Sequence, residues 1–192
     1  MLVRLLAPVV VTGLVLNAAP AGAQAVTQHL ALAADSNFMQ LAGSLGLLQV
    51  KLGALAEKKG SSPVVREFGR RMVADYSRAN GELAAGARAA AYPEPVMLRE
   101  HKQILDRFIK TGRSSFDKKY MAAMIDQHGE AARLFRTEAE QGRVVSLRQV
   151  AARLLPTVQQ HVSLATMTAG SIGADVTATA EGARPGSPGS DF

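Results

Sequence analysis

The sequence contains no cysteine and no tryptophan, and aromatic residues occupy only 5% of its 192 positions. Without cysteine the chain has no disulfide, no thiolate nucleophile and no cysteine metal ligand. Its fold must therefore depend on the packing of apolar side chains. The shortage of aromatic residues also leaves few surfaces on which nucleic-acid bases could stack.

Charge of one sign is not concentrated anywhere in the chain. The formal net charge is +6, but basic and acidic residues alternate, as in "REFGRRMVADYSR" (66–78) and "HKQILDRFIK" (101–110). A nucleic-acid-binding surface requires clustered basic residues, so we expect no nucleic-acid partner. A moderate positive charge is compatible with weak attraction to an anionic envelope surface.

The N-terminal sequence has the features of an export signal. Arg4 precedes an apolar segment, residues 5–16, which is shorter than the roughly 20 residues that a membrane span needs. Small residues follow it, including Ala21-Gly22-Ala23, a spacing that suits signal-peptide cleavage. We therefore predict a signal peptide (1–25), an N-terminal lead (26–34) and a location in the periplasm or outside the cell, with no transmembrane segment in the exported chain.

Apolar residues after the lead recur at steps of three and four, which is typical of amphipathic helices. This pattern predicts an all-α domain over residues 35–172, followed by a tail (173–192) too small and polar to pack. The expected helices cover residues 36–59, 63–92, 97–110, 114–142 and 146–172. Four long helices with one apolar stripe each predict an up-down four-helix bundle, in which the short third helix is an extra connecting element.

Several residues are expected to begin these helices. Asp35 or Ser36 would cap the first helix, and the Ser62 hydroxyl would cap the second, just before Pro63 at its first position. A weak internal repeat also relates "VVREFGRRMV" (64–73) to "SLRQVAARLL" (146–155). Two related helical hairpins would explain that similarity.

Five glycines fall inside the expected helices, where each costs about 1 kcal/mol relative to alanine. Close approach of neighbouring helices would explain their presence, and a cofactor cavity is the alternative. The glycines are Gly43, Gly46, Gly53, Gly69 and Gly129.

Four motifs resemble the family called domain of unknown function 4142, exported bacterial proteins with a ferritin-like four-helix fold. These motifs are "LGALAEKKGSS", "FGRRMVADYSRAN", "SSFDKKYMAAMIDQHGEAARLF" and "LRQVAARLLPTVQQHV". The resemblance covers residues 36–170 and implies a ferritin-like bundle, but it implies little about activity. The family usually has histidine where this chain has Tyr76, and glutamates where it has Gln49 and Lys51.

A ferritin-like fold raises the question of a di-iron site, which needs about four carboxylates and a Glu-x-x-His motif on two helices. Ile125 lies three residues before His128, and Val158 lies three residues before His161. Neither side chain binds a cation, and Gln49 is neutral. The sequence therefore argues against a ferroxidase.

A softer metal site remains open at the same helices. Met72, Met124, His128 and His161 all fall on stripes that face inward, and thioethers with imidazoles suit copper. The favoured interpretation is structural: the methionines fill the core and each histidine is neutral with one hydrogen bond. Asp75, Tyr76 or a water could supply that bond. His101, in a charged segment, is expected on the solvated surface.

No serine-nucleophile, zinc-protease or phosphate-loop pattern occurs in the sequence, so an enzyme is the less favoured interpretation. The leading hypothesis is an exported, non-catalytic bundle that binds an envelope protein, an anionic surface or a small apolar ligand, with no cofactor expected. The alternative is a metal-binding or redox protein that uses His128 and His161 with nearby methionines.

Overall fold

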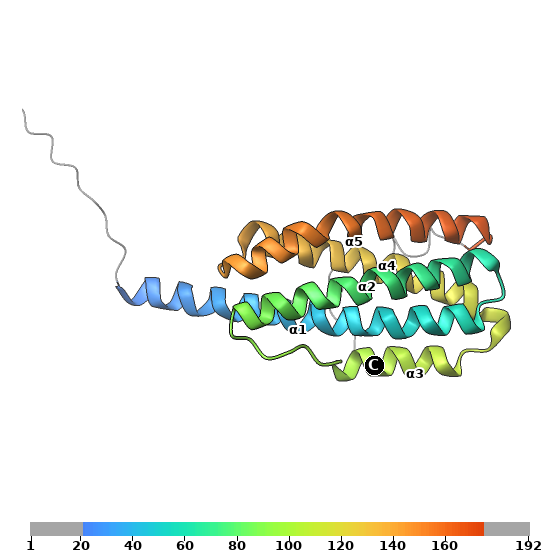
Figure 1. Cartoon of the computed structure of the whole chain (residues 1–192), viewed down its shortest axis with the longest axis horizontal. Helices are drawn as coiled ribbons and strands as arrows, with labels where there is room; N and C mark the ends of the chain where they lie inside the picture. The colour runs from blue at the N-terminus through green and yellow to red at the C-terminus, as the bar shows by residue number, and fades with distance from the viewer. Residues whose placement is uncertain (1–20, 175–192) are drawn as a thin grey trace, which may run out of the picture.

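A computed structural model describes the backbone of residues 21–174 and the side chains of residues 33–174. Over this range the regular elements are all helices and there is no strand, so the predicted all-α class is confirmed. The five helices in Figure 1 are α1 (Ala21–Lys59), α2 (Pro63–Ala89), α3 (Arg99–Lys110), α4 (Arg113–Gln141) and α5 (Val145–Ser171).

Two helical hairpins make up most of the molecule. Short links join α1 to α2 and α4 to α5, and these two pairs share the most extensive contacts. The hairpins pack together through α2 against α5 and α1 against α4. Helix α3 lies against α1 and carries the chain back along the molecule from the end of α2 to the start of α4 (Figure 1). The short connecting helix predicted from the sequence is therefore present.

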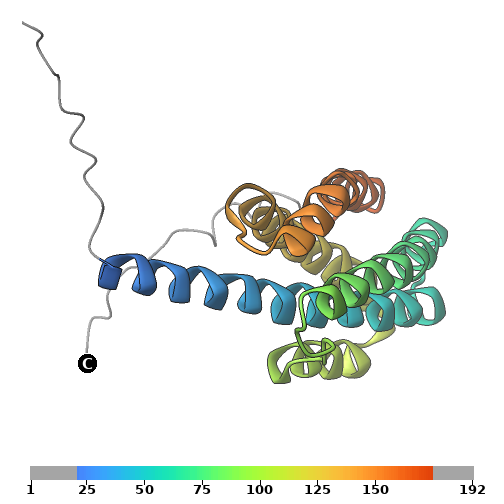
Figure 2. The same cartoon turned by 60° about the vertical axis from the view of Figure 1, so that its left-hand side comes forward.

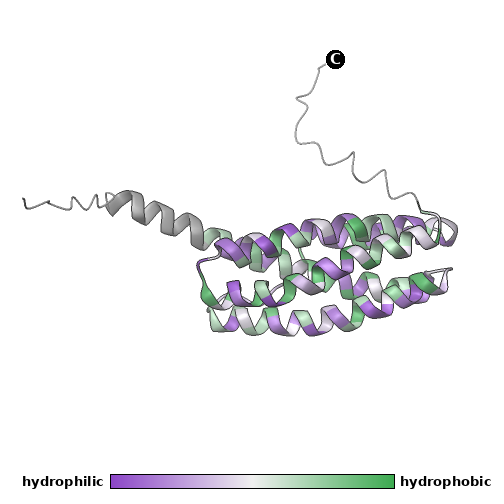
Figure 3. Cartoon of the chain, turned by 90° about the horizontal axis from the view of Figure 1, so that it is seen from above, coloured by the Kyte–Doolittle hydropathy of each residue, from purple (hydrophilic) through white to green (hydrophobic). Residues whose placement is uncertain are grey.

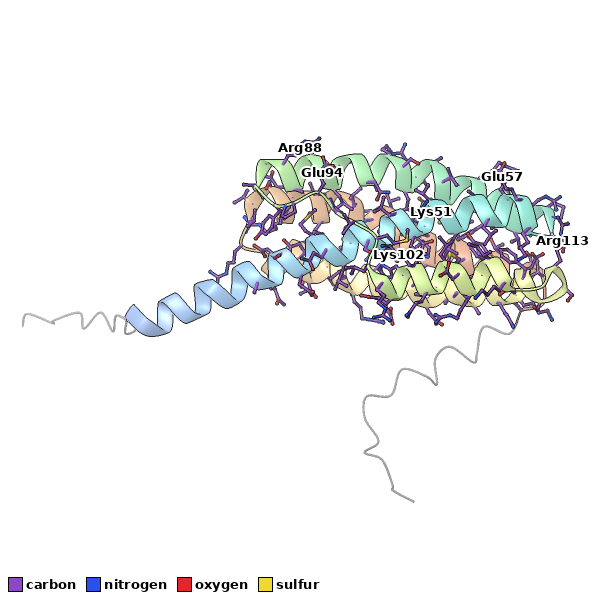
Figure 4. All side chains as sticks on the ribbon, turned by 90° about the horizontal axis from the view of Figure 1, so that it is seen from below. Lys51, Glu57, Arg88, Glu94, Lys102 and Arg113 are labelled. Atoms are coloured by element: carbon purple, nitrogen blue, oxygen red, sulfur yellow. The ribbon has the colours of Figure 1, made fainter. Side chains whose placement is uncertain are left out.

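Apolar stripes from the four long helices meet in one core. Leu48, Phe68, Phe135 and Leu154 come from different helices, and each is buried. Aromatic contacts join the hairpins, because the Phe68 ring centroid lies 6.0 Å from that of Tyr120. Figure 3 shows hydrophobic and hydrophilic residues alternating along each helix, and the charged side chains labelled in Figure 4 project outward. The spacing of apolar residues thus determines which face of each helix is buried.

Helix α1 begins earlier than the sequence analysis predicts, at Ala21 rather than Ser36. Residues 23–34 contain five alanines and no proline or glycine, so nothing in this stretch opposes a helix. Figure 2 shows α1 extending well beyond its neighbours. Its segment Ala33–Lys59 is long and apolar enough to span a membrane by length and composition, but 61% of the apolar window is buried inside the protein.

Two of the predicted chain segments fall partly or wholly outside the described residues. Residues 1–20 of the predicted signal peptide lie outside them, whereas residues 21–25 and the lead (26–34) form the start of α1. Residues 175–192 of the predicted tail also lie outside them.

Carboxylates from the opposite hairpin bind the link before α2 and the link before α5. Asp117 of α4 accepts hydrogen bonds from the backbone N–H groups of Ser61 and Ser62, at 3.1 and 2.7 Å. Asp35 of α1 accepts bonds from Arg143 and Val144, with a shortest distance of 2.7 Å. The predicted caps are therefore wrong. The Ser62 hydroxyl makes no capping bond, and Asp35 lies inside α1, where its carboxylate binds the backbone N–H groups just before α5.

The link between the two helices makes equivalent contacts in both hairpins. Asp117 follows Asp35 by 82 residues, and the repeat between residues 64–73 and 146–155 has the same offset. Arg66 donates a hydrogen bond to the Gly60 carbonyl at 3.1 Å, and Arg148 donates to the Gly142 carbonyl at 3.0 Å. These pairs also differ by 82 positions, so sequence and contacts relate the hairpins consistently.

Candidate functional site

Two histidines from the second hairpin meet in the core. His128 of α4 has 0% of its surface exposed and His161 of α5 has 1%. Their ring centroids lie 5.3 Å apart with the planes nearly perpendicular, at 88°. The antiparallel register of α4 and α5, which the sequence analysis leaves undetermined, brings them together.

The main chain fixes the orientation of the His128 ring. Its Nδ1 lies 2.7 Å from the carbonyl oxygen of Met124, one helical turn earlier. Because a carbonyl only accepts hydrogen bonds, Nδ1 must carry the proton and Nε2 must carry the lone pair. That Nε2 is buried and has no hydrogen-bond partner among the described residues.

A carboxylate fixes the second ring in the opposite tautomer. The Nε2 of His161 lies 3.0 Å from the carboxylate of Asp75 on α2, so Nε2–H is the donor. Arg78 also binds Asp75, at 2.7 Å. The remaining nitrogen, Nδ1 of His161, is buried and lacks a partner within the described part of the chain.

Burial keeps both imidazoles neutral. It lowers the pKa of His128 to about 4, although the bond to Met124 acts in the opposite direction. It also lowers the pKa of His161, and this effect exceeds the opposing effect of Asp75. Burial alone would raise the pKa of Asp75, but the hydrogen bond from His161, together with Arg71, brings that pKa below its usual value. At neutral pH the site therefore contains two neutral rings beside one carboxylate.

Tyr76 contacts both histidines from α2. Its ring centroid lies 5.7 Å from that of His128 and 5.5 Å from that of His161. Its hydroxyl is buried without a partner among the described residues, and burial raises its pKa, so the phenol stays protonated. Tyr76 thus contacts both rings, but its hydroxyl does not supply the histidine hydrogen bond that the sequence analysis left open to it.

The two candidate methionines are fully buried, both with 0% exposure. Met72 lies on α2 one turn after Phe68 and one turn before Tyr76, and the rings of both neighbours contact His128 at centroid distances of 6.4 and 5.7 Å. Met124 precedes His128 by one turn on α4. Met72 therefore lies at the level of the histidine pair.

Gln49 does not join the histidines through any described hydrogen bond. It is fully buried on α1, and its side-chain N–H donates to the Oε1 atom of Gln127 at 2.8 Å. Gln127 was not a candidate in the sequence analysis, because its partner on another helix has no local signature. The amide pair thus bridges α1 and α4.

His101 differs from its predicted environment. It is half-buried rather than solvated, with Nδ1 2.5 Å from the Ser44 hydroxyl. That hydroxyl accepts a hydrogen bond from the Leu98 backbone N–H at 2.7 Å. The hydrogen bonds of Ser44 with His101 and Leu98 therefore hold the start of α3 against α1.

The site offers few groups that could bind a cation. Among the described side chains, no group of three or more His, Cys, Asp or Glu residues could hold a metal. Two imidazoles on one tetrahedral ion, with bonds of about 2.0–2.1 Å, place their centroids roughly 5 Å apart. The 5.3 Å between His128 and His161 is compatible with that spacing. The site thus offers two nitrogen lone pairs with thioethers nearby.

Comparison with known proteins identifies one family. The chain matches the family described as Domain of unknown function (DUF4142) over residues 18–167, which is most of its length. No curated protein matches the chain. No solved structure matches it either. The match includes α1, α2, α4, most of α5 and both histidines, and the chain therefore belongs to the DUF4142 family.

Proposed function

We propose that this protein is an exported, non-catalytic metal-binding protein in which His128 and His161 hold a transition-metal cation. The observation that carries the proposal is the pair of buried ring nitrogens, Nε2 of His128 and Nδ1 of His161, that have no partner among the described residues. In each ring the other nitrogen donates a hydrogen bond, to Met124 or to Asp75.

This pattern is typical of metal-binding histidines. A ligating imidazole almost always donates its second N–H to a carboxylate or a carbonyl, which fixes its tautomer. A purely structural role explains the two donated bonds but leaves both lone pairs buried. Each unsatisfied group costs about 1–3 kcal/mol. A bound cation would satisfy both lone pairs together.

The finer architecture is part of the same proposal. We assign α1, α2, α4 and α5 to a four-helix bundle of ferritin-like topology, in which the connection containing α3 is the single long crossover. The contacts of α2 with α5 and of α1 with α4 support this assignment. Ile125 and Val158 occupy the Glu positions of the Glu-x-x-His motifs, so oxidation at a di-iron centre is not proposed.

The proposed location rests on the N-terminal sequence. A basic residue, an apolar segment and small residues support export to the periplasm or outside the cell. There the absence of cysteine protects the protein from thiol oxidation, and imidazole and thioether remain as its soft ligands. A net charge of +6 supports weak contact with an anionic envelope surface as a secondary property.

Metal titration of the untagged exported protein tests the proposal. We expect wild-type protein to bind one equivalent of Cu(I), Zn(II) or Co(II) with micromolar or tighter affinity, measured by competition with a chromogenic chelator. His128→Asn and His161→Gln should each weaken binding at least about tenfold. The asparagine amide can still donate to the Met124 carbonyl and the glutamine amide to Asp75, while the free lone pair is lost.

His101→Gln is the matched control, because it changes a half-buried histidine away from the pair. Its affinity should equal that of wild type. Unfolding in urea reports whether each variant remains folded. Equal binding by wild type and both core variants, or no binding of any of these ions, would contradict the proposal and leave an ordered water as the partner of the lone pairs.

A further inference from the structure

The chemistry of the site restricts which ion it accepts. We infer that the histidine pair selects a soft monovalent cation, Cu(I), with the Met72 thioether as third donor to Nε2 of His128 and Nδ1 of His161. This inference rests on the proposed function and deepens it. It is carried by the charge of the site, the identity of its donors and the position of Met72.

Charge disfavours a divalent ion here. The only acidic side chain with a described contact to either ring is Asp75, whose carboxylate already binds Arg78 at 2.7 Å and Arg71 at 3.4 Å. Little negative charge is left to offset a buried cation. In the idealised Born treatment the cost of burying an ion grows with the square of its charge, so a divalent ion costs about four times as much as a monovalent one.

The donors available are soft. Zn(II) in proteins normally takes four ligands from cysteine, histidine, aspartate and glutamate, and the described residues offer no group of three such side chains. Ca(II) and Mg(II) need shells of oxygen ligands. Thioethers are fully buried at Met72 and Met124, and soft sulfur ligands select Cu(I).

We infer the third donor from the place of Met72 on α2. It lies on the inward stripe of α2 between Phe68 and Tyr76, whose rings approach His128 to 6.4 and 5.7 Å. A side chain at that position faces the same level of the core as the ring. Met124 is one turn from His128 on the same helix, and its carbonyl already anchors that ring.

The enclosure of the site also favours an ion that loses its hydration shell easily. Both imidazoles are at most 1% exposed, and the rings of Phe68 and Tyr76 lie against them. Mg(II) dehydrates reluctantly and usually keeps several waters. A soft monovalent ion bound by two or three neutral donors needs no water ligand, which suits a site closed off from bulk solvent.

Anaerobic competition titrations test the selectivity. Wild-type protein would be titrated with Cu(I) against a chromogenic Cu(I) chelator, with Ag(I) as a surrogate that does not change oxidation state, and with Zn(II) against a zinc chelator. We expect one equivalent of Cu(I) to bind at least a hundredfold more tightly than Zn(II). Met72→Leu, which nearly conserves side-chain volume, should weaken Cu(I) binding at least tenfold.

Met39→Leu is the matched control for the loss of a thioether. Met39 is a buried methionine of α1 beside the Tyr92–Leu98 connection, and we expect its substitution to leave the Cu(I) affinity unchanged. Thermal unfolding would establish that both leucine variants fold like wild type.

The possible failures are distinguishable. Zn(II) binding as tight as Cu(I), lost in His128→Asn and His161→Gln, would overturn the selectivity while the proposed function stands. Wild-type Cu(I) affinity in Met72→Leu would overturn the third donor. Failure of all three ions to bind would overturn both proposals.

Discussion

Several side chains in this core bury polar atoms that lack a hydrogen-bond partner among the described residues. Among the described residues, seven side-chain nitrogen or oxygen atoms are buried without a hydrogen-bond partner. Three of them gather at the histidine site, on Tyr76, His128 and His161. Burying such groups costs stability. Their clustering is the basis of the proposed metal site.

Glu138 is another buried polar residue, ten positions after His128 on α4. It is 4% exposed on α4, and burial together with the charge of Asp35 raises its pKa to about 7, with Arg148 acting in the opposite direction. The sequence analysis did not single it out. It lies three residues after Phe135 on the inward stripe, so helical periodicity could have identified it.

Glu138 should make stability depend on pH. An acid with a raised folded-state pKa stays protonated in the fold while the unfolded chain ionises, so stability falls as pH rises from about 4.5 to about 7. Glu138→Gln removes this titration. We expect the variant to exceed wild type by about 1–2 kcal/mol at pH 8 and to match it at pH 4, measured by urea unfolding. A difference that is the same at both pH values would contradict this account.

For single residues, helical periodicity in the sequence correctly predicted which side chains are buried. It placed His128, His161, Met72 and Met124 on inward stripes, and all four are buried. It offered Asp75 as a histidine partner, and Asp75 binds His161. The partner of His128 is a main-chain carbonyl, which no side-chain pattern encodes.

At the scale of helices, two glycines control how closely α1 and α2 approach. A Cβ atom added to Gly53 would lie 2.6 Å from the Gly69 carbonyl oxygen, and one added to Gly69 would lie 2.6 Å from the Gly53 carbonyl oxygen. Each glycine thus permits contact with the backbone of the opposite helix. The expectation of close approach is met here, but at Gly129 an added Cβ would touch nothing within 4 Å.

This contrast provides a matched pair of substitutions. Gly69→Ala should destabilise the protein by about 2 kcal/mol or more, because the new methyl group overlaps a backbone atom that cannot rotate away. Gly129→Ala should stabilise it by up to about 1 kcal/mol through helix propensity alone. Thermal and urea unfolding of both variants measure the difference. Equal effects at the two sites would show that close packing does not explain Gly69.

Helix boundaries show where local sequence signals fail. Helix α1 ends at Lys59, as predicted, and α2 ends at Ala89, three residues before its predicted end. The caps at the starts of α2 and α5 come from Asp117 and Asp35 on other helices. Local preferences identify residues suited to capping. They do not identify which helix end a given carboxylate will meet after the hairpins dock, and this is why the predicted caps were wrong.

For the whole molecule, the sequence was sufficient to predict the helical class and the number of helices. Apolar stripes and short links predict each hairpin, because both are local properties. Contacts between the hairpins depend on register, which sequence periodicity does not determine. The distance between His128 and His161 also depends on register. The sequence therefore predicts two inward histidines, and only the three-dimensional structure shows that their rings lie side by side.

Nitrogen-15 NMR of the histidine rings tests the central claim most directly, because it observes both lone pairs in the intact protein. Without metal, His128 should show a protonated Nδ1 and His161 a protonated Nε2. One equivalent of Cu(I), added anaerobically, should shift the unprotonated Nε2 of His128 and Nδ1 of His161 together while both N–H groups persist. Core nitrogen resonances that stay unchanged in the folded protein, or a shift confined to His101, would contradict the account.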